Sequence, residues 1–183
     1  MSFRFTLILI GILVLLGGVA YVARKTPTLP PPPPQTWDID LMTIDKVVVR
    51  YQGKKMTFVR GEDKSTWYFD EPERGEVNLE RWSGVPLLLS GPRSKRLLEW
   101  TPDPAKLPEY GFNRPLMEID MGIEGGGSGT ILLGDKTPDG GAYYLMIKGY
   151  TPLYLVDYTW VDVIGRLVTE PPRLTGTPTP TPP

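Results

Sequence analysis

The feature that most constrains this chain is an uninterrupted run of eighteen uncharged residues, Phe5 to Val22. At about 1.5 Å per residue, a helix over this run is about 27 Å long, close to the hydrocarbon thickness of a bilayer. Arg4 precedes the run, and Arg24 and Lys25 follow it. We therefore predict a single transmembrane helix, in which the apolar side chains of Phe5, Leu9, Ile12, Leu15, Leu16, Val19 and Tyr21 contact lipid. Among these, Tyr21 lies where an interfacial aromatic residue is expected.

A cleaved signal peptide is the alternative for the same segment. Its apolar region would be 5–16, and Gly18 and Ala20 would supply the small residues before the cleavage site. The apolar run continues past Ala20 and ends in a basic pair, which favours a retained anchor. A short head is easily kept inside, so we expect the N-terminus in the cytoplasm and the following domain outside.

Proline separates the anchor from a globular region. The range 26–36 contains five consecutive prolines and predicts a stalk in the polyproline II conformation. All five tryptophans lie in 37–174, which can therefore build a core. The range 175–183 is a Thr/Pro-rich tail that we expect to be disordered. The predicted organisation is thus an anchor with a short head (1–25), a stalk (26–36), a domain (37–174) and a tail (175–183).

The composition excludes several kinds of chemistry. The chain has no histidine and no cysteine, so it lacks the usual general base near neutral pH and the usual ligands of transition metals. Three of the 20 basic residues precede Trp37, leaving 17 against all 21 acidic residues in the rest of the chain. A mildly acidic domain has no electrostatic footprint for a phosphate backbone. We predict no catalytic residues, no cofactor, no metal and no binding of nucleic acid.

The hydrophobic pattern predicts an α+β domain. β-Branched and alternating residues indicate strands at 44–52, 55–60, 66–69, 94–100, 116–123, 130–133, 142–148 and 153–156. A helix is expected from Asn78, kinked or broken near 82–85 because Pro86 lies inside its pattern. A second amphipathic helix follows Asp157 or Thr159. Short glycine-containing turns predict that the last four strands form an antiparallel meander, with one or two helices on one face.

Two loops resemble ligand sites but are better explained as turns. The glycine-rich range 125–129 precedes a strand and lacks the lysine of a phosphate-binding loop, so we expect a hairpin linker. Asp135 and Asp139 share a loop that lacks the ligand spacing of a calcium site. On 116–123, Glu118 and Asp120 lie on one face and could serve a carboxylate-based hydrolase, or form an ordinary solvated face.

Surface aromatic and basic residues are the remaining candidates. The residues that we expect in an interaction surface are Tyr110, Phe112, Arg114, Tyr143 and Tyr150. The segment 110–115 also suits a structural corner, because its aromatic residues can fill a core and its proline directs the next strand. Arg93, Lys95 and Arg96 indicate a solvated strand edge rather than a site for anionic lipid.

Three segments in order resemble a known bacterial family. They are Asp103-Pro104-Ala105-Lys106-Leu107 running into Tyr110-Gly111-Phe112-Asn113-Arg114-Pro115, then Leu133-Gly134 through Pro138-Asp139-Gly140, then Tyr143-Tyr144 before Leu153-Tyr154-Leu155-Val156. This order is similar to domain-of-unknown-function family 4340, whose members carry an N-terminal membrane helix. The resemblance covers most of 44–168, and this chain has one copy of the unit. It implies a location in the bacterial cytoplasmic membrane and an accessory role in the envelope, and it brings no catalytic residues.

Together these features predict a non-enzymatic, membrane-tethered accessory or scaffold subunit. Its extracytoplasmic domain would dock onto a larger membrane or envelope complex, either associated with a transporter or energy-transducing. The expected partners are the lipid bilayer, through the N-terminal helix, and proteins of that complex. A cell-surface module that binds or senses peptide, glycan or polymer is the alternative.

Overall fold

The computed structural model describes Leu13, residues 17–18, 37–82, 84–91 and 94–174. The predicted anchor residues Phe5, Leu9, Ile12, Leu15, Leu16, Val19 and Tyr21 lie outside this part of the chain, as do the stalk (26–36) and the tail (175–183). Among the residues that are described, no helix is both long enough and apolar enough to span a bilayer. The anchor therefore stays a prediction. The chain divides into two units, and the fold described below belongs to the unit Pro33–Pro183.

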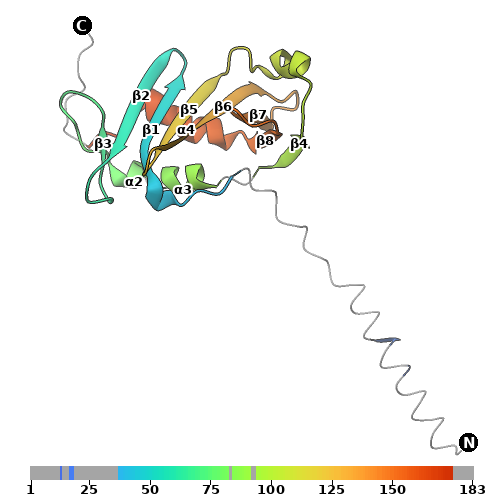
Figure 1. The fold of residues 1–183 in the computed structure, drawn as a ribbon, viewed down its shortest axis with the longest axis horizontal. Coiled ribbons are helices and arrows are strands. Elements are labelled where there is room, and N and C mark those ends of the chain that lie inside the picture. The colour runs from blue at the N-terminus through green and yellow to red at the C-terminus, as the bar shows by residue number, and fades with distance from the viewer. Residues whose placement is uncertain (1–12, 14–16, 19–36, 83, 92–93, 175–183) are drawn as a thin grey trace, which may run out of the picture. The chain divides into compact units, whose positions relative to one another are not determined.

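An antiparallel sheet of eight strands forms the body of the domain (Figure 1). Its strands follow the order β3-β2-β1-β5-β6-β7-β8-β4. Their bounds are β1 Ile44–Tyr51, β2 Lys54–Arg60, β3 Trp67–Phe69, β4 Arg96–Glu99, β5 Met117–Ile123, β6 Gly127–Lys136, β7 Ala142–Ile147 and β8 Leu153–Asp157. The predicted α+β class and the meander of the last four consecutive strands, β5 to β8, are confirmed.

The glycine-rich segment differs from the prediction. We expected a linker over 125–129 and a strand from Thr130, but β6 begins at Gly127. Gly127 pairs with Ile123 and Gly129 with Met121, so these glycines belong to the ladder with β5. The turn itself needs only Gly125 and Gly126, which adopt positive φ angles of 90° and 93° that favour glycine. The backbone hydrogen bonds of the ladder outweigh the weak strand propensity of glycine here.

In the described part of the domain, three α-helices accompany the sheet: α2 (Leu79–Trp82), α3 (Val85–Ser90) and α4 (Thr159–Thr169). The short 3₁₀ segments η1 (Leu41–Thr43) and η2 (Pro104–Tyr110) were not predicted. The expected break between Trp82 and Val85 is confirmed, because Gly84 has a φ of 92° and separates α2 from α3. Pro86 lies in the first turn of α3, where its missing N–H removes no helical hydrogen bond.

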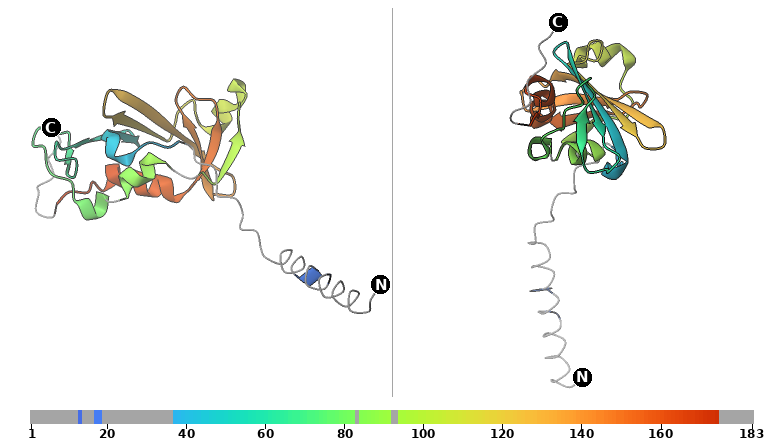
Figure 2. Two further views of the ribbon diagram at one scale, coloured as in Figure 1. Left: turned by 60° about the horizontal axis from the view of Figure 1, so that its bottom comes forward. Right: turned by 90° about the vertical axis from the view of Figure 1, so that its left-hand side faces the viewer.

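The helices lie on one face of the sheet, as the two further views show (Figure 2). Alternation along the strands places fully buried residues such as Val47, Val49, Ile119 and Ile131 in the main core with Ile164 of α4. This two-layer arrangement removes the apolar faces of α4 and of the sheet from water together. The apolar stripe of α4 and the apolar face of the sheet thus bury each other.

An aromatic cluster closes the core near β2 and β3. The ring of Trp82 lies 4.5 Å from the ring of Phe58 and 5.0 Å from that of Trp67, measured between centroids. Trp82 is 2% exposed, and its indole N–H has no hydrogen-bond partner among the described residues. The contribution of Trp82 to stability therefore comes from packing and not from hydrogen bonding.

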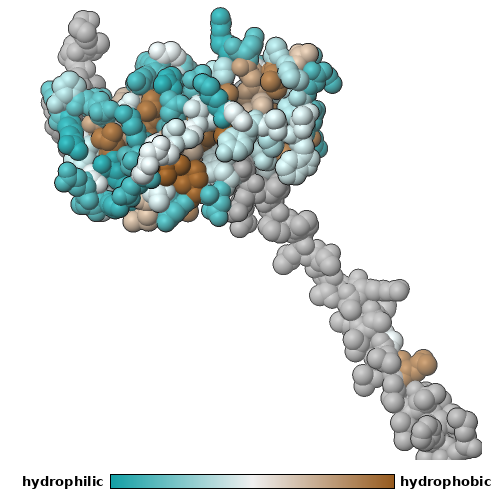
Figure 3. Space-filling view, in the orientation of Figure 1, coloured by the Kyte–Doolittle hydropathy of each residue, from teal (hydrophilic) through white to brown (hydrophobic). Residues whose placement is uncertain are grey.

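The face opposite α4 is mostly hydrophilic (Figure 3). Arg50 on β1 pairs with Asp120 on β5 at 2.6 Å and lies 3.6 Å from Glu118. Thr130 on β6 donates a hydrogen bond of 2.9 Å to Asp120. These cross-strand contacts are typical of a sheet face that remains in contact with water.

The segment η2 packs over part of this second face. The ring of Tyr110 lies 4.8 Å from that of Tyr144, and the carbonyl of Tyr110 approaches Gly134 so closely that a Cβ added there would overlap its oxygen. Gly111 adopts a φ of 84° and ends η2. The segment 110–115 thus forms a turn into β5, but its aromatic residues are half-buried on this second face and do not fill the main core as we expected.

Candidate functional site

The five residues predicted to form an interaction surface lie in different places. Tyr110 and Phe112 are half-buried in the corner that follows η2. Tyr143 packs against the main core and lies near Lys136, whose Nζ is 6.0 Å from its ring centroid. Arg114 and Tyr150 are exposed, in the loop before β5 and in the turn between β7 and β8. The structure therefore does not bring these five residues together on one surface, because the register places Tyr143 on the helix-covered side.

Tyr110 is a structural residue of the corner. Its hydroxyl donates a 3.4 Å hydrogen bond to Oε1 of Glu99. Desolvation of the phenol, together with the neighbouring carboxylate of Glu99, raises the pKa of Tyr110 above its ordinary value. The neutral phenol therefore serves as the hydrogen-bond donor that connects the end of η2 to Glu99.

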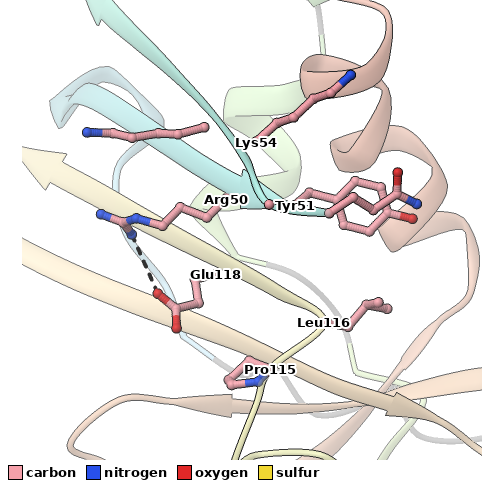
Figure 4. A pocket seen from close by; sticks show the side chains of 9 residues that line it. Arg50, Tyr51, Lys54, Pro115, Leu116 and Glu118 are labelled. Atoms are coloured by element: carbon pink, nitrogen blue, oxygen red, sulfur yellow. Dashed lines mark ion pairs between the residues drawn. The ribbon is translucent and has the colours of Figure 1, made fainter.

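A hollow of about 270 Å³ lies at the tip of the β1–β2 hairpin (Figure 4). Arg50, Lys54 and Lys55 line it, with Tyr51, Pro115 and Leu116 on the apolar side and the carboxylate of Glu118 opposite Arg50. The Arg50 guanidinium and Glu118 point toward each other across the hollow (Figure 4). Arg50 also pairs with Asp120 at 2.6 Å, so its charge is shared between the carboxylates of Glu118 and Asp120.

The acidic residues that the sequence offered as possible sites form ion pairs and hydrogen bonds within the fold. Glu118 and Asp120 face the same side as predicted, but Arg50 and Thr130 engage them. Asp139 accepts hydrogen bonds from the hydroxyl of Thr137 and from the N–H of Gly141, which lower its pKa. The carboxylate of Asp139 thus closes its own turn, as the turn chemistry of the segment predicts.

The two edge strands of the sheet, β3 and β4, differ in whether another segment pairs with their outer side. At β3 the chain returns beside the strand: Val77 donates its N–H to the carbonyl of Trp67, and Phe69 donates its N–H to that of Gly75. At β4, within the part of the chain that the structure describes, no segment pairs with the side turned away from β8. An edge strand of this kind presents unpaired N–H and C=O groups that can bind another strand.

Two exposed aromatic residues lie at the end of this open margin. Trp100 follows β4 directly and is 69% exposed, and Tyr150 lies in the turn before β8 and is 68% exposed. Glu99 pairs with Leu153, so both aromatic residues lie at the end of the sheet where β8 begins. Large exposed aromatic side chains beside unpaired backbone groups are typical of a protein-binding surface. We call Arg96–Trp100 together with Tyr150 the β4 margin.

Lys95 fixes the start of β4 in place. Its ammonium donates to the carbonyl of Gly141 at 2.7 Å and pairs with Asp157 at 2.8 Å, and its own N–H donates to the carbonyl of Leu155. Asp157 also accepts from the N–H of Thr159 at the start of α4. The predicted strand edge at Lys95 and Arg96 is confirmed, while Arg93 lies outside the described residues.

The Lys95–Asp157 pair gives the domain a stability that depends on pH. Hydrogen bonding from Lys95, followed by that from the N–H of Thr159, lowers the pKa of Asp157 from 3.8 to about 2. A carboxylate with a lowered pKa in the folded state stabilises the fold above its ordinary pKa, and this stability is lost as the pH falls from about 4 to about 2. We expect Asp157→Asn to lower the free energy of unfolding by about 0.5–1 kcal/mol at pH 7, since solvent screens this half-exposed pair. Urea unfolding of both proteins at pH 7 and pH 2 should show that most of the difference is lost at pH 2; an undiminished difference at pH 2 would contradict this account.

Sequence patterns did not single out Trp100, which they place at the end of the strand 94–100. The signal that could have identified it is the mixed segment Lys95–Glu99, because charged residues at both ends of a short strand are typical of a sheet edge. Only the pairing of β4 with β8 shows that this edge is the last in the sheet.

Comparisons of the chain with protein-family models, with curated protein sequences and with solved structures give no match in any of the three. The resemblance to domain-of-unknown-function family 4340 therefore stays a prediction. The β4 margin, its open backbone edge and its two exposed aromatic residues are the features from which a function can be argued.

Proposed function

We propose that this chain is a non-enzymatic, membrane-tethered accessory or scaffold subunit. Its N-terminal helix would hold the domain outside a bacterial cytoplasmic membrane, and the domain would dock onto a larger membrane or envelope complex. The observation that carries the proposal is the β4 margin: Trp100 directly follows the uncovered edge strand of the described sheet, Tyr150 lies in the turn before the neighbouring β8, and both are more than two-thirds exposed.

The energetics of interfaces favour this surface over the rest of the domain. Tryptophan and tyrosine contribute much of the binding energy at protein interfaces, because they bury a large area at low cost in conformational entropy. A strand edge adds main-chain hydrogen bonds to a docked segment. The other margin offers less, since the segment 75–77 already pairs with β3.

A ligand-binding or sensing module receives less support. That function needs an apolar or aromatic groove along the meander. The described lining of the hollow at the hairpin tip is mixed: it has three cationic residues, one carboxylate and a single aromatic residue, Tyr51. A carboxylate-based hydrolase would need Glu118 and Asp120 free in a pocket, whereas both lie within 4 Å of Arg50.

Purification of the tagged, full-length chain from native membranes in mild detergent tests this function. We expect partner proteins to be recovered in stoichiometric amounts with the wild-type chain. Trp100→Ala and Tyr150→Ala should each reduce that recovery about tenfold or more, because truncating an aromatic hot spot at an interface costs about 2 kcal/mol.

Tyr158→Ala is the matched control. Tyr158 is another exposed tyrosine, at 53%, but it lies beyond the opposite end of β8, at the start of α4. Its substitution should leave the recovery of partners unchanged. Recovery of the wild-type chain alone, or an equal loss with Tyr158→Ala, would exclude docking through the β4 margin.

A further inference from the structure

We propose that the β4 edge pairs with the β4 edge of a second copy of this chain, in an antiparallel arrangement that joins two sheets. The inference rests on the proposed function of the β4 margin as a protein-docking surface, and it names one occupant of that margin. A second copy is chosen as the occupant because of the order of charges along β4 and because the outer edge of β4 has no strand partner in the described part of the domain.

The residue order of β4 is self-complementary. If a two-fold axis passes between Leu97 and Leu98, Arg96 of each copy lies opposite Glu99 of the other. In the same register, the two central leucines of each copy lie at the axis, where β4 has its register shift against β8.

The charges on β4 lack ion-pair partners within the described domain. Arg96 is exposed and Glu99 is half-buried, and neither forms an ion pair with any residue that the structure describes; Glu99 accepts a hydrogen bond from Tyr110. Arg96 pairs with Leu155 and Glu99 with Leu153, two residues of β8 that point to the same face, because the register shifts by one residue between Leu97 and Glu99. Both charges therefore lie on one face, where self-pairing forms two symmetric ion pairs.

Charge also selects the direction of pairing. A parallel arrangement in register would place Arg96 beside Arg96 and Glu99 beside Glu99, and like charges directly opposite each other destabilise a sheet. The antiparallel arrangement replaces both repulsions with attractions. An edge strand that carries only positive charges commonly resists pairing with another strand. β4 carries Arg96 and Glu99 instead, so each charge can lie opposite the opposite charge of the second copy.

The edge is already held in a strand conformation. The bonds of Lys95 to Gly141, Asp157 and the carbonyl of Leu155 fix the start of β4, and Tyr110 holds Glu99 near its end. Both ends of this edge are therefore fixed, which reduces the conformational entropy that β4 loses on pairing, while the register shift between Leu97 and Glu99 lies at its centre. Tethering of both copies to one bilayer would raise their effective concentration further.

Disulfide cross-linking provides a direct test, because the natural chain has no cysteine. Two differently tagged full-length chains, one with Arg96→Cys and the other with Glu99→Cys, are produced together and oxidised in the membrane. Opposed residues of an antiparallel pair have Cβ atoms about 5 Å apart, close enough to form a disulfide. We expect a disulfide-linked heterodimer from the mixture. Either chain alone should cross-link little, because position 96 of one copy does not lie opposite position 96 of the other, and the same is true of position 99.

Lys46→Cys mixed with Glu99→Cys serves as the control, because Lys46 is exposed on β1, several strands away from β4. Cross-linking of this control pair to the same extent would show random collision and would overturn the proposal. Absence of the heterodimer from the 96/99 mixture would also overturn it.

Charge reversal gives a second, independent readout on the natural backbone. Arg96→Glu and Glu99→Arg each place like charges opposite each other in both symmetric pairs, and we expect about tenfold weaker dimerisation. The double variant Arg96→Glu/Glu99→Arg restores complementarity and should recover the dimer, measured by light scattering in mild detergent. Dimers that resist both single reversals would form elsewhere, for example through the N-terminal segment, and would contradict pairing at β4.

These outcomes are distinguishable from those for the proposed function. If Trp100→Ala removes a co-purifying protein while the 96/99 mixture gives no heterodimer, docking at the β4 margin stands and self-pairing fails. If the heterodimer forms while no other protein depends on Trp100, self-pairing stands and docking onto a larger complex fails.

Discussion

Trp82→Ala should lower the free energy of unfolding by about 4 kcal/mol, because it removes a tryptophan side chain that contacts both other rings of a buried aromatic cluster. The rings of Phe58 and Trp67 lie 4.5 and 5.0 Å from the indole of Trp82, and the truncation leaves a cavity between them that the short helix α2 cannot fill by moving. Urea unfolding of the full-length chain in mild detergent, followed by circular dichroism in the far ultraviolet, measures the loss. Such a loss approaches the whole stability of an ordinary domain.

Trp82→Phe is the informative control for this effect. The indole N–H of Trp82 has no hydrogen-bond partner in the described part of the chain, so replacing the indole with a phenyl ring removes a buried polar group that is not satisfied. This gain offsets part of the lost packing, and we expect a net change of about 1 kcal/mol or less. If Trp82→Phe were as destabilising as Trp82→Ala, the N–H would have to make a hydrogen bond that stabilises the fold.

Gly134→Ala should be the second most damaging substitution, at about 3 kcal/mol. An added Cβ at this position would overlap the carbonyl oxygen of Tyr110 and would lie 3.4 Å from the ring of Phe112. The obstructing atom belongs to the backbone, so the corner that follows η2 would have to move away from β6. Movement of this corner would also separate Tyr110 from Tyr144 and from Glu99 of the β4 margin.

Gly129→Ala, in the same strand, is the matched control. Its added Cβ would approach the Cε of Met121 at 3.8 Å, which is an ordinary contact with a flexible side chain. We expect a change within about 0.5 kcal/mol, since alanine restricts the unfolded chain and fits the strand. Chemical unfolding curves of the two variants should differ clearly; if they coincide, η2 does not rest on Gly134 as closely as described.

The sequence predicted part of the candidate site. Charge identifies Lys95 and Arg96 as a strand edge, and the sheet order agrees. Tyr110, Phe112 and Tyr143 are grouped with Tyr150 by sequence because aromatic residues are enriched at interfaces, but three of the four contribute to packing within the domain. Exposure, which separates a packing aromatic residue from a binding one, depends on contacts between segments far apart in the chain.

Local patterns in the sequence determined the elements and the class of the fold. Alternation with period two identified β5 to β8, their short glycine turns made them neighbours, and the position of Pro86 marked the break between α2 and α3. These properties depend on residues close together in the chain, so a single sequence carries them. The apolar run 5–22 gave the prediction of a membrane anchor in the same way.

Tertiary structure decided which strands became neighbours across long connections. β1 pairs with β5, more than sixty residues later, and β4 pairs with β8 as the last strand of the sheet. Both pairings arise because burying one continuous apolar face under α2, α3 and α4 requires a single sheet, and several strand orders are compatible with the same local pattern. The open edge at β4, and with it the exposure of Trp100, is a consequence of that strand order and could not be read from any one segment.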